Sequence, residues 1–126
     1  MAFVPKKPEI DMRQVDAGEL LAKMQRGAIA LFASELGIDP CRVLAMDYGR
    51  FSSRNNFHVL AADARALGTY LLSTGLDVPV GELAVALKLP KQVVSKLVHR
   101  GEDLRDNSVA DRIIRRVEEI YGVGGA

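Results

Sequence analysis

The stretch from Val80 to Arg100, which reads VGELAVALKLPKQVVSKLVHR, decides the expected fold of this 126-residue chain. Apolar residues recur in it at helical spacing on both sides of a Lys-Leu-Pro step. In a helix-turn-helix unit counted from Val80, apolar residues face the core and one small residue lets the two helices approach closely. These positions carry Leu83, Ala84, Leu87, Leu89, Val94 and Leu97. The sequence therefore predicts two short helices joined by a tight turn, the second helix covering 90–101.

Lys88 and Pro90 belong to the turn expected between these helices. Units of this kind usually carry glycine in the place of Lys88, and we expect lysine to be tolerated there at a modest cost in backbone strain. Pro90 falls in the first turn of the second helix, where its missing N–H is harmless. The pattern is thus compatible with a tight connection despite the absence of glycine.

The outer face of the predicted helix 90–101 is polar and basic. In the major groove lysine suits guanine, glutamine suits adenine and serine suits either, whereas Lys and Arg side chains also bind phosphates. We expect base contacts from Lys91, Gln92 and Ser95, and phosphate contacts from Lys88, Lys96, His99 and Arg100. Because a helix of this kind enters the major groove with its N-terminal residues at the base edges, the sequence predicts binding to double-stranded DNA.

Charge is distributed unevenly along the chain. The net charge is only +1, yet residues 88–100 contain four basic residues and no acidic residue. A local positive patch on a nearly neutral protein suits contact with phosphates at one face. The charge pattern therefore favours the same segment as the helix-turn-helix pattern.

Helical periodicity covers most of the remaining chain. Helices are expected over 17–36, 40–46 and 57–73, and a last helix follows Asn107. Between the second and third of these, DYGRFSSRNN (47–56) is rich in turn-forming residues and predicts a loop. The loop residues expected to contact the DNA backbone are Arg50, Ser52, Ser53 and Arg54. Since no stretch alternates as a β-strand does, the expected fold class is all-α with about six helices.

The expected organisation is one domain over 15–121, with a flexible N-terminal arm over 1–14 and a flexible tail over 122–126. The one cysteine, Cys41, excludes an internal disulfide, suits a reducing cytosol and is expected to pack in the interior. The residues show neither a signal peptide nor a membrane span, and no metal-ligand cluster or catalytic set. We therefore expect a cytoplasmic protein that is not an enzyme and needs no cofactor or metal.

A run of motifs from 62 to 87 resembles the C-terminal DNA-binding domain (domain IV) of the bacterial replication initiator DnaA. The motifs are Ala64-Arg65 to Tyr70-Leu71, Thr74-Gly75-Leu76, Val78-Pro79 and Glu82-Leu83-Ala84. The segment 29–45 is similar to the first two helices of that family, so the resemblance covers about residues 20–120. It implies a helical fold of the DnaA domain IV or Trp-repressor kind, with 90–101 in the major groove and 47–56 in the place of a minor-groove loop. Arg65 matches a family arginine that can approach the DNA backbone.

The departures from that family limit what the resemblance implies. In place of its Gly-Arg-Asp-His-Thr-Thr signature the chain carries the six residues 88–93, KLPKQV, and its loop is less basic. No GxxxxGK[ST] phosphate-binding motif occurs, so no nucleotide is expected. The resemblance thus implies the fold and the docking mode, without the initiator's DNA box or ATP-driven origin melting.

Three functional readings remain open at this point. The first is a nucleoid-associated transcription regulator, an activator of a phage-like or gene-transfer-agent operon that acts with RNA polymerase or another regulatory protein. The second is a replication modulator acting at an origin. The third is a protein-interaction module that keeps the fold without binding DNA, which the near-neutral net charge favours.

Overall fold

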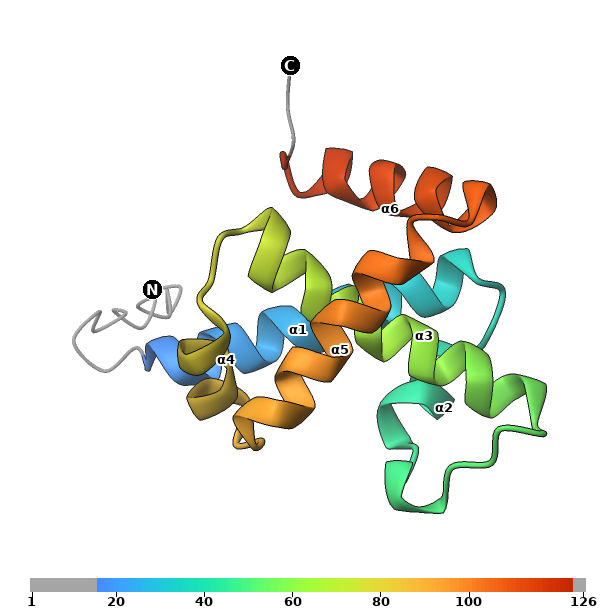
Figure 1. Cartoon of the computed structure of the whole chain (residues 1–126), viewed down its shortest axis with the longest axis horizontal. Coiled ribbons are helices and arrows are strands. Elements are labelled where there is room, and N and C mark those ends of the chain that lie inside the picture. Colours follow the sequence, from blue (N-terminus) through green and yellow to red (C-terminus); the bar gives the residue numbers. More distant parts are fainter. Residues whose placement is uncertain (1–15, 124–126) are drawn as a thin grey trace, which may run out of the picture.

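The structure, a computed structural model, describes residues 16–123, and within this range it contains six α-helices and no strand (Figure 1). The helices are α1 (Ala17–Glu35), α2 (Pro40–Ala45), α3 (Asn56–Tyr70), α4 (Val80–Leu87), α5 (Lys91–Leu104) and α6 (Ser108–Ile120). A 3₁₀ turn (Tyr48–Arg50) precedes α3, and a π-helical turn (Leu71–Gly75) follows it. The all-α class is confirmed. The expected arm over 1–14 and residues 124–126 of the expected tail lie outside the described residues.

Most helices begin at a side chain that accepts hydrogen bonds from the first backbone amides. Asp16 Oδ1 accepts from the N–H of Gly18 at 2.8 Å, and the same role falls to Asp39, Asn55 and Asn107 at α2, α3 and α6. Such caps satisfy amides that lack a partner within the helix. Helices α4 and α5 differ, because each follows a proline and receives no side-chain cap.

Three helices end at a residue in the left-handed region. At α1 and α6 this residue is glycine, Gly37 (φ 79°) and Gly122 (φ 70°). At α4 it is Lys88 (φ 55°). In all three the following residue donates its N–H back to a carbonyl five residues earlier, for instance from Leu89 to Ala84 at 3.1 Å, which is the Schellman pattern. The turn after α4 thus has the left-handed backbone conformation that usually requires glycine, although its residue is lysine.

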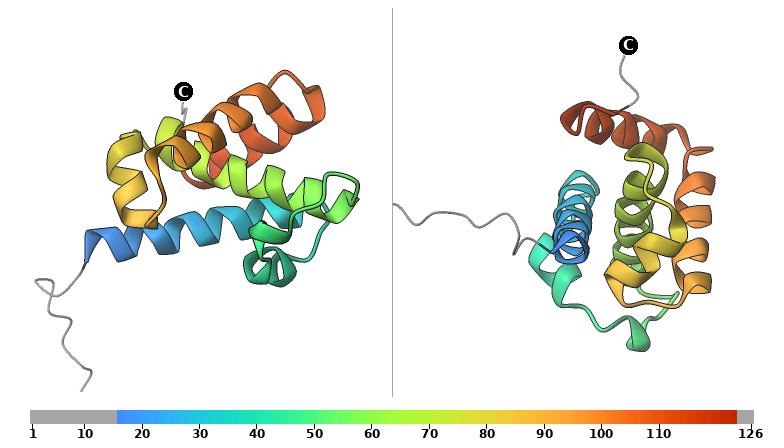
Figure 2. Two further views of the ribbon diagram at one scale, coloured as in Figure 1. Left: turned by 60° about the horizontal axis from the view of Figure 1, so that its bottom comes forward. Right: turned by 90° about the vertical axis from the view of Figure 1, so that its left-hand side faces the viewer.

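Helix α3 forms the centre of the molecule. It packs against both α1 and α5, and the three helices lie side by side as successive layers (Figure 2). Every residue of the segment 66–72 is buried. Helix α4 contacts α1 and α5, and α6 contacts α1. No helix between residues 16 and 123 is long and apolar enough to cross a membrane.

Two glycines allow the layers to approach closely. A methyl group at Gly68 in α3 would lie 2.7 Å from Cγ1 and 3.0 Å from the backbone nitrogen of Ile29 in α1. A methyl group at Gly101 in α5 would lie 2.5 Å from Cβ of Tyr70 in α3. Since real Cβ contacts are not this short, both interfaces depend on the missing side chain.

The close approach at Gly101 explains a wrong prediction about α5. Leu97 was expected in the core, but it is only half-buried and lies apart from the core cluster, whereas Val98 packs against the cluster. The residues facing the centre are Val94, Val98 and Gly101, spaced four and three positions apart, and this face turns Leu97 toward the helix flank. Leu83, Ala84 and Val94 are buried, and Leu87 and Leu89 pack partly buried against the core, as predicted.

Other boundaries and placements also differ from the sequence-based expectation. The helix expected over 90–101 begins at Lys91 and continues to Leu104. Cys41, expected in the interior, is exposed. Val123 belongs to the end of α6 rather than to a free tail, because its N–H donates to the carbonyl of Glu118 at 2.8 Å.

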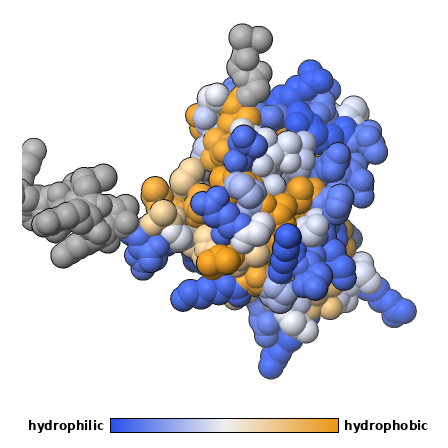
Figure 3. All heavy atoms as spheres, turned by 60° about the vertical axis from the view of Figure 1, so that its left-hand side comes forward, coloured by the Kyte–Doolittle hydropathy of each residue, from blue (hydrophilic) through white to orange (hydrophobic). Residues whose placement is uncertain are grey.

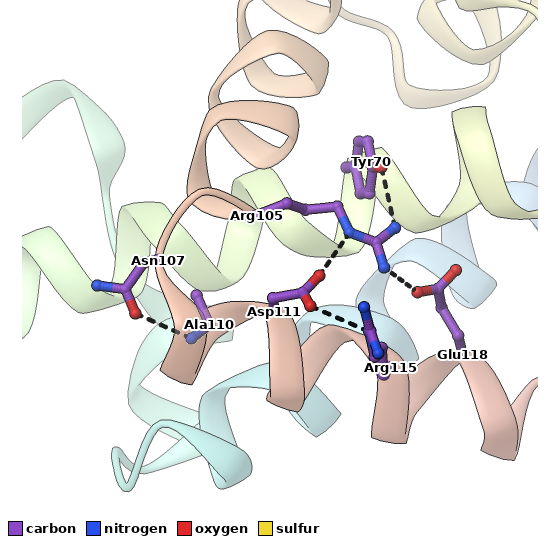
Figure 4. A network of polar contacts seen from close by, with 7 residues as sticks. All are labelled: Tyr70, Arg105, Asn107, Ala110, Asp111, Arg115 and Glu118. Carbon is purple, nitrogen blue, oxygen red and sulfur yellow. Dashed lines mark hydrogen bonds and ion pairs between the residues drawn. The ribbon is translucent and has the colours of Figure 1, made fainter.

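A polar network fixes the corner between α5 and α6 (Figure 4). The Arg105 guanidinium donates to Asp111 (3.0 Å), Glu118 (2.7 Å) and the Tyr70 hydroxyl (3.2 Å). Burial opposes the charged form of Arg105, but these partners outweigh it and raise the pKa of Arg105. The hydrogen bond from Arg105, together with the charge of Arg115, lowers the pKa of Asp111 despite some desolvation. The network joins α3, α5 and α6.

Candidate nucleic-acid interface

The unit formed by α4, the turn and α5 presents the polar residues that the sequence singled out. Lys88 adopts φ 55° and ψ 42°, so α4 closes and the chain turns directly into α5. The side chains of Lys88, Lys91 and Gln92 are exposed. Burial of Leu83, Ala84 and Val94 holds the opposite sides of both helices against the core. The unit therefore leaves the turn and the start of α5 open to solvent.

The remaining predicted residues of α5 lie in different surroundings. Lys96 is exposed and Ser95 is half-buried. Arg100 donates through Nε (2.9 Å) and Nη2 (2.8 Å) to a single carboxylate oxygen of Asp63 in α3. His99 Nδ1 lies 3.8 Å from a carboxylate oxygen of Glu102. The cations in the first half of α5 thus have no carboxylate partner among residues 16–123, whereas His99 and Arg100 in the second half lie next to carboxylates. The sequence of 88–100 alone could not show this difference, because Asp63 and Glu102 lie outside that segment.

The loop between α2 and α3 is held by its own contacts. The backbone N–H of Ser52 donates to His58 Nδ1 at 2.8 Å, and the Phe51 ring stacks on the His58 ring with centroids 6.1 Å apart. Arg50 and Arg54 are both exposed, and Arg50 Nε lies 3.7 Å from Asp47. Ser52 and Ser53, also predicted as contacts, are exposed as well. His58 therefore has a structural role that the sequence did not indicate.

A hollow of about 270 Å³ connects this loop with the turn before α5. Tyr48 of the loop and Leu87 and Leu89 of the turn line it, together with Arg26 of α1 and Arg65 of α3. The Arg65 guanidinium carbon lies 4.3 Å from the centre of the Tyr48 ring. Burial raises the pKa of Tyr48, and the positive charge of Arg65 partly opposes this. The hollow brings four elements that are distant in sequence onto one face.

Arg26 is the residue of this face that the sequence analysis missed. It is exposed, and no carboxylate of residues 16–123 forms an ion pair with it. Within the sequence it reads as one more polar position on a solvated helix face. Only the packing of α1 beside the turn reveals that it lies near the predicted cations.

Ion pairing divides the cations of the described chain into two groups. On the α6 side, Arg105, Arg115 and Arg116 each pair with a carboxylate at 3.2 Å or less. Around the hollow, the turn and the start of α5, the cations without a carboxylate partner among residues 16–123 are Arg26, Arg65, Lys88, Lys91 and Lys96. The division is not complete, because Lys23 of α1, Arg42 of α2, Arg54 of the loop and Arg112 of α6 also lack a carboxylate partner among residues 16–123. The electrostatic field of the unpaired group is not cancelled locally.

A different surface lies between α4 and the start of α1. Leu21, Ala22 and Val85 line a groove of about 770 Å³ there, with Glu19 and Glu82 at its edge. Val85 is 80% exposed, and nearby Leu20 is 51% exposed. Figure 3 shows apolar surface gathered on this side of the molecule, next to the start of the described chain. This groove is apolar with carboxylates at its edge, and Lys88 of the turn also lines it.

Comparison of the chain with protein-family models, with curated proteins and with solved structures found no match.

Proposed function

We propose that this chain is a sequence-specific double-stranded DNA-binding protein that inserts α5 into the major groove. The observation that carries the proposal is the gathering of cations without carboxylate partners around the turn and the first half of α5. Most of the binding free energy of such proteins comes from cations that displace counterions from phosphates. A cation already paired with a carboxylate contributes less to this, so the unpaired group at the turn and α5 supports the choice of this face.

The N-terminal half of α5 supplies the proposed base contacts. Lys91 and Gln92 are exposed at the first turn of the helix, the part that reaches base edges in helix-turn-helix proteins. Lysine suits guanine and glutamine suits adenine. Ser95 is half-buried one turn later and contributes from the flank of the same face. Lys88 and Lys96 stand on either side of these residues and position the helix on phosphates.

The loop and the hollow supply the proposed contacts to the flanking backbone. Arg50 and Arg54 are exposed on the loop, and Arg26 and Arg65 line the hollow between the loop and the turn. The open first amides of α5, which have no side-chain cap, add partial positive charge next to the turn. His99 and Arg100 contact phosphate in this arrangement only when they exchange their carboxylate neighbours for it.

The proposed biological role is that of a transcription regulator in the bacterial cytoplasm, associated with the nucleoid. Its support is the resemblance of residues 20–120 to the DNA-binding domain of DnaA, combined with altered residues in the place of that family's readout signature. A regulator of this size must also contact RNA polymerase or another regulatory protein. The groove between α1 and α4, which reaches the turn at Leu87 and Lys88, offers a surface for such a partner.

Selection of bound fragments from a random duplex pool, followed by affinity measurement at two salt concentrations, tests the proposal. We expect an enriched motif and an affinity that falls steeply with salt, because phosphate contacts release counterions. Occurrence of the motif at promoters supports regulation of transcription, and its occurrence at a replication origin supports a replication modulator. No enrichment and no dependence on salt would overturn the proposal.

A protein-interaction module is the second candidate function, and the groove between α1 and α4 favours it. An exposed apolar surface beside Glu19 and Glu82 suits a segment that combines apolar and basic side chains. The substitution Val85→Glu would weaken such a complex and leave DNA binding unchanged. A purified complex that forms with the wild type and is lost with Val85→Glu, together with no retention on DNA, would favour this candidate over the first.

A further inference from the structure

Two apolar side chains lie on the flank of α5 where polar residues would be expected. Val93 and Leu97 are half-buried, and neither belongs to the core cluster nor packs against it from its edge. They stand four positions apart and so lie next to each other on one side of the helix. The core-facing side of α5 is occupied by Val94, Val98 and Gly101, so Val93 and Leu97 lie outside the core contacts of the helix.

These two side chains form part of a shallow hollow on the outside of α5. Its lining also includes Lys96 and Arg100, which place positive charge at its edge, and Asp103 marks its C-terminal end. All of the lining residues belong to α5 itself. The hollow therefore lies on the outer surface of α5, where a binding partner could contact it, and not at an interface between helices.

The charge around the hollow favours nucleic acid as its occupant. Lys96, which lines the hollow, lacks a carboxylate partner among the described residues and suits phosphate or guanine. Gln92 lies directly before Val93 in the first turn of α5. An apolar surface between such residues in the major groove has one common apolar partner, the C5-methyl group of a pyrimidine.

We propose that Val93 and Leu97 form a pocket for the C5-methyl group of a thymine in the bound site, and that they determine specificity at that base pair. This inference rests on the proposed function, since it requires α5 to lie in the major groove. The same methyl group occurs on 5-methylcytosine, so the chemistry recognised is a C5-methylated pyrimidine. In unmodified DNA only thymine carries it.

The test uses the duplex obtained by selection and replaces each of its thymines, one at a time, with deoxyuridine, which lacks only the methyl group. We expect one position at which deoxyuridine weakens binding of the wild-type protein roughly fourfold, the effect of removing one methyl group from an apolar contact. At that position a cytosine–guanine pair is rejected, and 5-methylcytosine paired with guanine is bound better than cytosine. The wild-type measurement does not depend on any variant folding.

The variants Val93→Ala and Leu97→Ala assign the effect to the pocket. Each should weaken binding to the thymine duplex and remove most of the difference between thymine and deoxyuridine. Val85→Ala in α4 is the matched control, because it makes the same change at an exposed valine outside the hollow and should keep the difference. Melting followed by circular dichroism verifies that all variants remain folded.

The outcomes separate this inference from the function on which it rests. If no duplex is enriched or bound, the proposed function fails. If a duplex is bound with steep salt dependence and no thymine is sensitive to loss of its methyl group, the function stands and the pocket is refuted. A sensitive thymine whose effect persists unchanged in both Val93→Ala and Leu97→Ala would also refute the assignment to these side chains.

Discussion

Lys88 combines a conformational cost with an electrostatic role. It occupies the left-handed region at the end of α4, where Gly37 and Gly122 stand at the ends of α1 and α6. A side chain there costs energy because its Cβ approaches the backbone. The side chain is exposed before the start of α5 and lines the groove between α1 and α4. A glycine would give the same turn without strain, so the charge offers a reason for lysine at this position.

Two substitutions at Lys88 separate the strain from the charge. Lys88→Gly removes both, and we expect it to raise the free energy of unfolding by about 1 kcal/mol. Lys88→Gln removes the charge and keeps the strain, so stability should change little. Both should weaken DNA binding to a similar degree. Urea unfolding and titration of the selected duplex measure the two effects, and unchanged affinity in both variants would contradict a role for Lys88 on DNA.

Asp63 is the residue that holds Arg100 away from other anions. Its carboxylate accepts two hydrogen bonds from the guanidinium, at 2.8 and 2.9 Å. We expect Asp63→Asn to strengthen DNA binding and to steepen the dependence of affinity on salt by about one unit, since one more cation becomes available. Asp106→Asn makes the same charge change at the corner between α5 and α6 and serves as the control. If both variants behave alike, the effect is one of net charge, and Arg100 does not reach the DNA.

At the scale of elements, local chemistry allowed most helices to be predicted. Asp16, Asp39 and Asn107 cap α1, α2 and α6, and such caps can be predicted locally because they depend only on neighbours along the chain. The orientation of α5 was predicted only in part. Its rotation depends on contact with Tyr70, which is 31 positions from Gly101 in the sequence and is not visible in local periodicity.

In the candidate site, too, features that depend on neighbouring residues could be predicted, and features that depend on distant residues could not. Lys88, Lys91 and Gln92 could be identified because they belong to one continuous pattern. The pairing of Arg100 with Asp63 could not, since these residues are 37 positions apart. Arg26 joins the site only because α1 packs beside the turn. Contacts between distant segments were thus the part that the sequence could not supply.

Gly101 tests whether the approach of α5 to α3 sets the orientation of the proposed reading helix. A methyl group there would lie 2.5 Å from Tyr70 Cβ and 3.1 Å from the Ala66 carbonyl oxygen. We expect Gly101→Ala to lower the free energy of unfolding by about 1–3 kcal/mol, as overpacking does. Gly81→Ala in α4 is the control, because nothing lies within 4 Å of that position. It should be neutral or stabilising by up to about 1 kcal/mol. Equal behaviour of the two variants in urea unfolding would show that α5 does not approach α3 this closely.

The strongest group of ion pairs and the largest group of unpaired cations lie in different parts of the described chain. The network of Arg105, Asp111 and Glu118 joins three helices on the α6 side, whereas the turn and the first half of α5 carry cations without carboxylate partners among residues 16–123. The paired side serves stability and the unpaired side serves the proposed binding. Substitutions in the paired network should therefore change stability and leave DNA affinity largely unaffected, and substitutions of the unpaired cations should do the reverse.

Acid should weaken the paired side in a defined direction. Because the pKa of Asp111 is lowered in the folded protein, its contribution to stability is present above the unfolded value of about 4 and is lost as pH falls through the lowered value. We expect the free energy of unfolding to fall between about pH 5 and pH 3 in the wild type and to fall less in Asp111→Asn. Urea unfolding across this range measures it. Parallel pH profiles for the two proteins would mean that Asp111 does not couple to folding.

The most direct test of the central claim compares the salt dependence of DNA affinity in two variants that lose the same charge from opposite sides. One variant carries K88Q, K91Q and K96Q, and the other carries R112Q, R115Q and R116Q. On the selected duplex, the first should lower the slope of log affinity against log salt by roughly two to three units, because each phosphate contact contributes about 0.9. The second should leave the slope near that of the wild type. Equal losses in the two variants, or no loss in the first, would contradict the claim that the turn and α5 bind DNA.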